Sequence, residues 1–567
     1  MAIDVRRGGA RPPQLRLDPQ VDFTGGLNAI EDRFQLAPNE SPDCLNVDIH
    51  RRGGVQRRRS VRSWGSYDPF GTGASPLELF EHRDQINDSA KVVATKGGGV
   101  NALMAVGVGA GWTAVTNTGQ DKIHDHAMMN GKSWFACKLQ ATQSWETPSG
   151  VPAAATTVIG DSAGGYQNDY ATAVGNIFPH CQFVESHGGF MWAAWTDEGA
   201  ITHPTRIRFS HPGYADRWAE DDWIDVGDED GDEIVAIKSF RDHLLVFMHR
   251  SVHAVFGYSR QNFQVVKVSS SVGAESKKNI SVTPQGVWFF SPDRGVYFYN
   301  GDGEPQWAFE KIWPLMDSGS FNEALFADVV VASVSGKIWV SVPQDDSTDV
   351  TFVFDPAVGA WVRYGLAITG HVEFQNSSGL VEHLASTAGN AGLIKLDTGA
   401  ASDSFNDAAS PADVGINSYY RTRWMDGGSP FLPKRYKKPE FIVSGVSTHV
   451  IQAHIYFDYD DATAAKTLQL NVVGDLSTTN LVWDDDDDSA PYVVTSDPTT
   501  NHSADSGFLW DSKQWAVQSA ATQDEIIRGG TIGGTGRAVA INFVGPTDVQ
   551  WEIRGFTLKY LAKKPRS

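Results

Sequence analysis

The sequence predicts an all-β protein: a β-propeller of about six to eight blades, with an extended N-terminal arm before it and a C-terminal β-sandwich after it. Short runs of β-branched and aromatic residues alternate with turns rich in Gly, Pro and Asp over most of the chain. The 567 residues include 56 Gly and 18 Trp, which suits many strands joined by tight turns. Sustained helical periodicity is absent almost everywhere, and its best candidate is the run over residues 120–132.

Three stretches of the central region repeat one plan of strand, turn and strand. Residues 242–259 hold two β-rich runs around a polar bend, and residues 285–303 place a Ser-Pro-Asp-Arg-Gly turn between two runs. Residues 336–365 repeat the plan, with Asp-Pro and Gly-Ala-Trp at the turn. Tyr297 and Trp361 stand at comparable points after their turns. Recurring Gly and aromatic residues of this kind are typical of propeller blades.

Changes in composition divide the chain into four parts. Residues 1–74 are rich in Arg, Pro and Gly without a sustained period, and we expect an extended arm there. Residues 75–398 carry the propeller pattern, with a predicted insertion around residues 100–185. Gly, Ala, Ser and Asp dominate residues 399–414, which predicts a linker. The alternating strands of residues 415–567 suit one β-sandwich.

The predicted arm differs from the rest of the chain in charge. Residues 1–62 contain eleven Arg, no Lys and eight Asp or Glu, whereas the whole chain has a net charge of −21. Guanidinium groups pair well with carboxylates, so we predict that the arginines at the end of the arm bind an acidic neighbouring subunit. The alternative is a solvated basic loop. The predicted subunit-interface residues are Arg51, Arg52, Arg57, Arg58, Arg59 and Arg62.

The negative net charge limits the classes of partner. It argues against a general nucleic-acid binder, because phosphate contacts need a cationic surface. It is compatible with a protein past which nucleic acid slides without binding. The first residues lack the apolar core of a secretory signal, and no run of about 18 apolar residues predicts a membrane span. We expect a soluble protein, made in a cytoplasm and not inserted in a membrane.

Two short motifs resemble catalytic signatures but lack the partners that the chemistry needs. Gly160, Ser162 and Gly164 spell the pattern of a nucleophile elbow. Strands and long helices do not alternate around them, however, and the nearest oxyanion-like stretch, residues 187–190, follows the serine instead of preceding it. The sequence at residues 130–133 ends like a P-loop but lacks its first glycine. We predict no catalytic residue and no enzyme activity.

Metal binding has equally weak support in the sequence. His124 and His126 flank Asp125, but no further ligand follows at a recognisable spacing. The acidic runs at residues 228–233 and 484–488 do not fit an EF-hand register. We interpret both runs as solvated loops, with a weak calcium site as the alternative, and predict no cofactor.

Several loose motifs, taken in order, resemble those of bacteriophage tail structural proteins. Residues 100–185 match none of that group. The stretches similar to parts of it are residues 206–218, 232–257, 295–303, 419–428, 437–443, 455–460 and 551–561. The opening of the chain carries the densest set of these motifs. They are a GGLN element (Gly25–Asn28), an acidic and polar element (Glu40–Asp43), an Asn-Val-Asp element (Asn46–Asp48) and a Gly-Gly element with arginines (Gly53–Arg59).

The resemblance implies a virion protein of the tail, such as the nozzle of short-tailed phages or the tail-tip hub of long-tailed ones. Copies of the chain, usually as a hexamer, would form a ring around the DNA exit channel and help to retain and deliver the genome. Neighbouring tail or adaptor proteins would be partners, and DNA would pass without specific binding, beside the propeller. The chain would be made in the host cytoplasm, and the family supplies no catalytic residues.

Two other functions remain open at this stage. A host-binding tail protein would recognise glycans of the cell envelope through aromatic residues of the C-terminal sandwich such as Trp510 or Trp515. A glycan-cleaving propeller enzyme is the further alternative. Residues 291–298 resemble the Asp-box of sialidase-type propellers, but in that family the box is a structural hairpin turn remote from catalysis.

Overall fold

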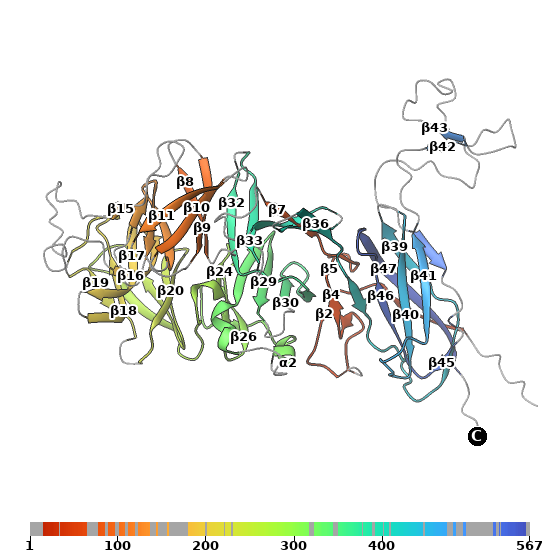
Figure 1. Ribbon diagram of the computed structural model, residues 1–567. Helices are drawn as coiled ribbons and strands as arrows, with labels where there is room; N and C mark the ends of the chain where they lie inside the picture. Colours follow the sequence, from red (N-terminus) through yellow and green to blue (C-terminus); the bar gives the residue numbers. More distant parts are fainter. Residues whose placement is uncertain are drawn as a thin grey trace, which may run out of the picture. The chain divides into compact units, whose positions relative to one another are not determined.

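The fold is almost entirely β-structure (Figure 1). The helical segments of the described residues are α2 (Trp313–Met316) and the 3-10 turns η2 (Lys277–Asn279) and η3 (Glu323–Asp328). Within the described part of the chain, no helix combines the length and the apolar character needed to cross a membrane. The computed structural model describes residues 15–32, 35–64, 78–84, 89–96, 101–107, 112–118, 123–136, 143–145, 156–157, 180–198, 201–219, 221–227, 231–316, 323–343, 350–376, 378–387, 392–400, 402–407, 410–445, 448–472, 480–482, 492–494, 525–528, 532 and 534–562.

The chain divides into two compact units, and each is assembled from separate stretches of sequence. Residues 59–356 and 363–414 form one, which we call the propeller unit. Residues 1–58, 357–362 and 415–567 form the other, the sandwich unit. The predicted arm is therefore not a separate part, because its residues are shared between the two units.

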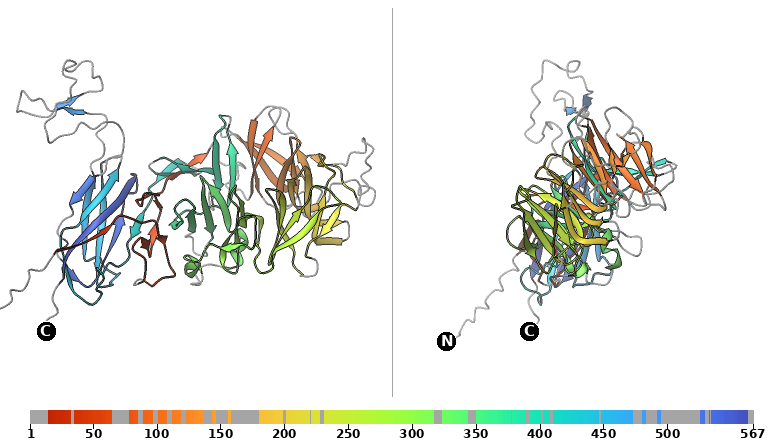
Figure 2. Two further views of the ribbon diagram at one scale, coloured as in Figure 1. Left: turned by 180° about the vertical axis from the view of Figure 1, so that it is seen from behind. Right: turned by 90° about the vertical axis from the view of Figure 1, so that its left-hand side faces the viewer.

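The described residues contain seven four-stranded antiparallel sheets, which confirms a β-propeller and sets its blade count at seven (Figures 1 and 2). Each of the first six blades is a meander of consecutive strands. Blade 1 is β8 (Glu78–Asp84), β9 (Ser89–Lys96), β10 (Asn101–Gly107) and β11 (Trp112–Thr118); blade 2 is β12 (Asp125–Met129), β13 (Lys132–Ala136), β14 (Gln143–Trp145) and β15 (Thr156–Thr157); blade 3 is β16 (His180–His187), β17 (Phe190–Glu198), β18 (Ile201–Phe209) and β19 (Trp223–Asp225).

The next three blades follow the same order. Blade 4 is β20 (Ile234–Phe240), β21 (His243–Met248), β22 (Val252–Phe256) and β23 (Gln264–Ser269); blade 5 is β24 (Ile280–Val282), β25 (Val287–Ser291), β26 (Gly295–Tyr299) and β27 (Gln306–Trp307); blade 6 is β28 (Val330–Val334), β29 (Lys337–Val342), β30 (Val350–Asp355) and β31 (Ala360–Tyr364). The described residues of the predicted insertion at residues 100–185 belong instead to blades 1 to 3.

Blade 7 takes its fourth strand from the N-terminal part of the chain. Strands β32 (Gly370–Gln375), β33 (Val381–Ser386) and β34 (Leu393–Thr398) are completed by β7 (Ser60–Trp64), which pairs with β34. The hydroxyls of Ser60 and Thr398 lie 2.8 Å apart, and the N–H of Val61 donates to the carboxylate of Asp403 at 2.9 Å. The ring of blades is thus closed by two segments that lie far apart in the sequence.

Adjacent blades pack face to face through apolar side chains. The middle strand β21 is buried along its whole length, as expected of a strand covered on both faces. Trp192 and Phe209 of blade 3 share one apolar cluster with Leu244 and Val246 of blade 4. Continuous apolar runs in the sequence therefore correspond to strands, such as β21, that are covered on both faces.

Two packed sheets form the sandwich unit. Phe543 of the five-stranded sheet meets Phe441 and Phe556 of the eight-stranded sheet, with ring centroids 5.9 and 5.7 Å away. The eight-stranded sheet contains β1 (Leu15–Gln20), β5 (Val47–Ile49), β6 (Val55–Arg57), β38 (Lys434–Tyr436), β39 (Glu440–Gly445), β44 (Glu525–Arg528), β45 (Thr535–Gly536) and β47 (Trp551–Ala562). The five-stranded sheet contains β4 (Cys44–Leu45), β37 (Tyr419–Arg421), β40 (His449–Phe457), β41 (Lys466–Val472) and β46 (Val539–Val544). Two further pairs of short strands are β2 (Gly26–Leu27) with β3 (Glu40–Ser41) and β42 (Asn480–Val482) with β43 (Tyr492–Val494).

The structure corrects the predicted extended arm. Strands β1 and β6 both pair with β47, near the other end of the sequence, and β4 pairs with β37. These N-terminal strands are too short to show a period in the sequence, and their partners lie hundreds of residues away. Local pattern therefore gave no sign of them.

Two further predictions change for a local reason. Strands β35 (Asp403–Asp407) and β36 (Ser410–Val414) form a hairpin where residues 399–414 predicted a linker. The helical candidate at residues 120–132 contains β12, whose side chains are alternately buried and partly exposed. That period of two is the signature of a strand.

A charge placed in β7 will test the closure of the propeller. Val61 is fully buried, so Val61→Asp places an unpaired carboxylate in the seam of blade 7 and is expected to lower the free energy of unfolding by more than about 3 kcal/mol. Arg62→Ala, at the exposed neighbouring position, should change it by less than about 0.5 kcal/mol. Denaturant unfolding of both variants is the measurement, and equal small effects would contradict the closure.

Candidate functional site

The first strand of each of the seven blades contributes residues to a central channel. Its cavity volume is about 420 Å³, and its lining comes from β8, β12, β16, β20, β24, β28 and β32 together with η2. Channels and clefts at the axis of a symmetric arrangement are where binding sites of such folds are usually sought. The channel is therefore the first candidate for a functional site.

Acidic and basic side chains meet in this channel. Lys277 Nζ lies 3.3 Å from Glu78 Oε2 and 3.4 Å from Asp125 Oδ1. Lys278 Nζ lies 3.7 Å from Glu78 Oε1 and donates to the carbonyl of Thr369 at 3.2 Å. These contacts join blades 1, 2 and 7 to η2, which precedes blade 5. The ammonium groups are thus paired with groups of the chain itself.

Glu185 and Lys238 also line the channel and influence each other electrostatically. Burial raises the pKa of Glu185 to about 7. Burial alone would lower the pKa of Lys238, but Asp125, Glu185 and Glu78 outweigh it, and the pKa of Lys238 is raised. Lys238 therefore stays charged, while Glu185 gains or loses its proton near neutral pH.

His126 is held as a neutral ring inside blade 2. Its Nε2 lies 2.8 Å from Ser133 Oγ, and its ring lies 5.1 Å from Phe80 and 5.0 Å from Phe135. Burial lowers the pKa of His126 to about 3. His124 lines a different cavity, so the two histidines of the sequence motif do not converge. Among the described residues, no group of three His, Cys, Asp or Glu side chains is placed to hold a metal ion.

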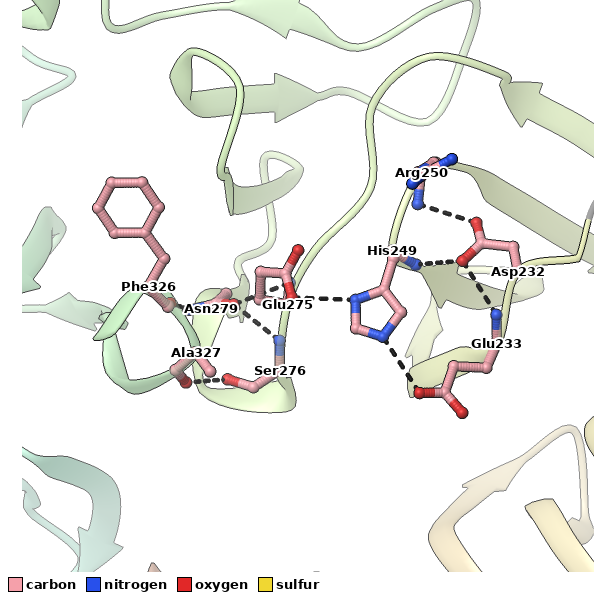
Figure 3. A network of polar contacts seen from close by, with 9 residues as sticks. All are labelled: Asp232, Glu233, His249, Arg250, Glu275, Ser276, Asn279, Phe326 and Ala327. Atoms are coloured by element: carbon pink, nitrogen blue, oxygen red, sulfur yellow. Dashed lines mark hydrogen bonds and ion pairs between the residues drawn. The ribbon is translucent and has the colours of Figure 1, made fainter. Parts of the chain in front are cut away.

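A smaller cavity of about 280 Å³ adjoins the channel, because Glu78, Lys277 and Lys278 line both. Figure 3 shows the polar network at its rim, in which the ring of His249 lies between two carboxylates. Its nitrogens are 3.0 Å from Glu275 Oε2 and 3.3 Å from Glu233 Oε1. The carboxylate of Asp232 accepts the backbone N–H groups of His249 and Arg250.

Asn279 extends this network to blade 6. It is fully buried, and its side-chain oxygen accepts the N–H groups of Glu275 and Ser276 at 3.0 and 2.7 Å. Its amide donates to the carbonyls of Phe326 and Val329 at 3.0 and 2.8 Å (Figure 3 includes Phe326). The network holds the loops of blades 4, 5 and 6 in fixed positions, which is a structural task.

The predicted interface arginines divide into two groups. Arg51, Arg52 and Arg62 are exposed, and so is Arg59, whose guanidinium lies 3.7 Å from Asp397.

Arg57 and Arg58 are instead buried in the sandwich unit, which corrects their assignment to a subunit interface. Arg57 donates to the carbonyl of Thr547 at 3.0 Å and to Gln550 at 3.3 Å, and Arg58 donates to Asn46 at 2.9 Å.

The other sequence motifs fall in turns or outside the described residues. Asn130 and Gly131 form the turn between β12 and β13. Residues 292–294 form the turn between β25 and β26, and Gly295, which begins β26, has a φ of +83°. The second finding matches the hairpin role of the Asp-box. Ser162, Trp510, Trp515, residues 228–230 and residues 484–488 lie outside the described residues.

The sequence singled out two channel residues, Asp125 and His126, as part of a weak metal motif, and it missed the other charged residues of the channel. Glu185 lies in β16, which contains several other polar residues, and Lys238 lies in the more apolar strand β20, so no common local pattern marks them. Glu78 and Asp125 begin their strands, whereas Glu185 and Lys238 stand late in theirs, so only the closed ring of blades brings them to one axis.

Comparison with known proteins gives no functional assignment. No family model matches the chain, and no curated protein does. Among solved structures, the chain is similar to the WD40 repeats of RRP9 (TM-score 0.37, 9% identity, 59% of this chain and 98% of that one). It is also similar to the extracellular domain of a putative hybrid two-component system from B. thetaiotaomicron (TM-score 0.40, 12% identity, 80% and 61%) and to YCF48 bound to D1 peptide (0.36, 10%, 60% and 100%). At these TM-scores none of the likenesses carries an argument about what this chain does.

Replacing Asn279 will test the tie between blades 5 and 6. The Asn279→Asp variant keeps an oxygen that accepts the two backbone N–H groups, but it replaces the donating amide with a carboxylate oxygen that repels the two carbonyls. We therefore expect the free energy of unfolding to fall by about 2–4 kcal/mol. The control is Asn300→Ala, at an exposed asparagine whose side-chain oxygen accepts the N–H of Asp302 at 2.9 Å. Unfolding midpoints report the difference, and a neutral Asn279→Asp would contradict a structural role.

Glu185 makes stability depend on pH in a defined window. Its pKa is about 7 when folded and 4.5 for an unperturbed carboxyl, so the folded chain binds more protons between these values. The free energy of unfolding should therefore fall as pH rises from about 4.5 to 7 and then level off. In the Glu185→Gln variant, the decrease in the free energy of unfolding across this window should be smaller by on the order of 1–3 kcal/mol. Unfolding midpoints across the window are the measurement; Ser281→Ala, which also lines the channel, should follow the wild-type profile.

Proposed function

We propose that the chain is a structural protein of a bacteriophage tail, which forms a ring around the DNA exit channel and helps to retain and deliver the genome. One observation carries the proposal. The residues that give the opening of the chain its resemblance to tail proteins are used inside the fold. Asn28 accepts the N–H groups of Ile30 and Glu31 at 3.1 and 3.3 Å, and the carboxylate of Glu40 accepts the N–H of Ala37 at 3.0 Å.

The later elements of the same resemblance join the two ends of the chain. Ser41 Oγ donates to the carbonyl of Arg421 at 2.6 Å, and the amide of Asn46 donates to the carbonyl of Asn417 at 2.7 Å. Arg57 makes the corresponding contacts to residues 547 and 550. A catalytic or ligand-binding motif directs its functional groups at a ligand, whereas these groups bind the chain itself. Their use supports a structural role.

The distribution of charge supports the relation to DNA. The propeller unit holds 23 of the 47 Lys and Arg but 42 of the 68 Asp and Glu. The sandwich unit holds the other 24 basic and 26 acidic residues and is close to neutral. An acidic wall repels phosphate, and the repulsion adds up over the copies of a ring. DNA that moves past such a wall has no attractive contacts to break.

The propeller channel itself is an unsuitable path for DNA. Its volume of about 420 Å³ is that of a small-molecule pocket, and paired side chains line it. A duplex is wider than its major groove, which alone measures about 12 Å. We therefore place the DNA path of the proposed ring outside the individual propellers.

Purified virus particles that encode this chain give the direct test. The chain should be found by mass spectrometry in several copies per particle, and antibodies against it should label the tail in electron micrographs. The recombinant chain should not retard duplex DNA in a gel at low salt. Absence from the particles would contradict a virion role, and retention of DNA that salt abolishes would contradict the repelling wall. A glycan array separates the host-binding alternative, which requires sugar binding by the chain.

A further inference from the structure

One face of the eight-stranded sheet combines apolar and basic side chains. Strands β1 and β38 lie on either side of the end of β47: Leu15 and Arg435 are both directly opposite Leu561. One step along, Leu17 is opposite Lys559, whose carbonyl accepts the N–H of Lys437 at 2.7 Å. Directly opposed residues point to the same side of a sheet. These six residues, Leu15, Leu17, Arg435, Lys437, Lys559 and Leu561, define what we call the β1–β38 face.

The two sides of the sheet differ at this point. Tyr436, Leu558 and Tyr560, which alternate with the residues of the face, are at most 5% exposed and belong to the core. On the face itself, Leu15 is 52% and Leu17 is 61% exposed. No described strand covers it. Adjacent exposed leucines in an ordered strand indicate a surface that binds something.

A buried lysine fixes the loop that leads into β38. Lys434 is 1% exposed, and its Nζ donates to the carbonyls of Ser429, Leu432 and Arg537 at 2.7, 3.0 and 2.7 Å. The loop carries Phe431, which is 85% exposed. A side chain presented from a fixed loop loses little conformational entropy on binding, and exposed aromatic residues are frequent anchors of protein interfaces.

We propose that the β1–β38 face, with Phe431 beside it in sequence, binds the propeller unit of a neighbouring copy of this chain. The inference rests on the proposed ring and names its contact. Charge complementarity selects this occupant, because the propeller unit carries 42 acidic against 23 basic residues, and the face adds Arg435 and Lys437 to its leucines. The third cation, Lys559, is paired with Glu440 of the same sheet at 2.6 Å. Contact between two different surfaces of identical copies generates a ring when the rotation closes.

Cross-linking between differently labelled copies tests the contact. The full chain is prepared with ¹⁴N and with ¹⁵N, mixed, and treated with a carbodiimide that joins lysine to carboxylate without a spacer. Cross-links of mixed isotope composition from Lys437 to Asp or Glu within residues 59–356 or 363–414 are expected. Mixed cross-links that join other surfaces while these are absent would overturn the inference and leave the ring intact.

The double variant Leu17→Glu with Arg435→Glu supplies the second arm of the test. Both positions are exposed, so the circular dichroism spectrum should be unchanged, while the concentration at which rings form should rise by about tenfold or more. Val450→Glu is the matched control, since it adds a carboxylate at a 40% exposed apolar position in β40 of the five-stranded sheet. Mass photometry measures the assembly.

Each remaining outcome decides against the inference. A double variant that forms rings like the wild type would show that the face is not the contact. A wild-type chain that stays monomeric would also contradict the proposed contact. If that chain were nevertheless detected in virus particles, its proposed role as a tail protein would still stand. Sedimentation with anionic vesicles that the double variant abolishes would assign the face to a membrane surface instead.

Discussion

The pairing of β7 with β34 is the constraint on which the rest of the propeller depends. A seven-bladed ring has two ends that must be joined, and here the joint is a strand that comes from residues 60–64. Arg57 and Arg58, just before that strand, are buried in the sandwich unit. The chain therefore passes from one unit to the other within a residue or two of the seam. Both strands of the seam belong to the propeller unit, and the residues just before β7 belong to the sandwich unit.

The charged channel follows from the same closed ring. Once seven first strands surround an axis, polar residues from different positions of these strands and from η2 are brought together. Glu78, Asp125 and Lys277 compensate one another there by ion pairs within 3.4 Å. Replacing one partner of such a pair leaves a buried charge without compensation, which costs more than the pair itself contributes. The compensated channel is consistent with an axis that serves stability, while the outer surface carries the charge imbalance.

Local features of the sequence were sufficient for most of the propeller. Residues 285–303 contain strands and a turn that need only their own neighbours, and they form β25 and β26 with Phe289 opposite Tyr297. The strands β1, β6 and β7 could not be predicted in this way, since their partners lie in β47 and β34. The three successive arginines 57–59 look alike in sequence. Arg57 and Arg58 are buried and Arg59 is exposed because Thr547 and Asn46 supply acceptors that no local pattern reveals.

The position of β47 has a consequence for synthesis on the ribosome. Leu15 is made early and its partner Leu561 is made late, so the sheet that contains β1 cannot form until nearly all of these residues have left the ribosome. A chain that terminates early, or is cut before β47, lacks the strand on which β1, β6, β38 and β39 are assembled. Such a fragment has no β1–β38 face. If rings are built through that face, an incomplete chain cannot join one, and no separate quality-control protein is needed to exclude it.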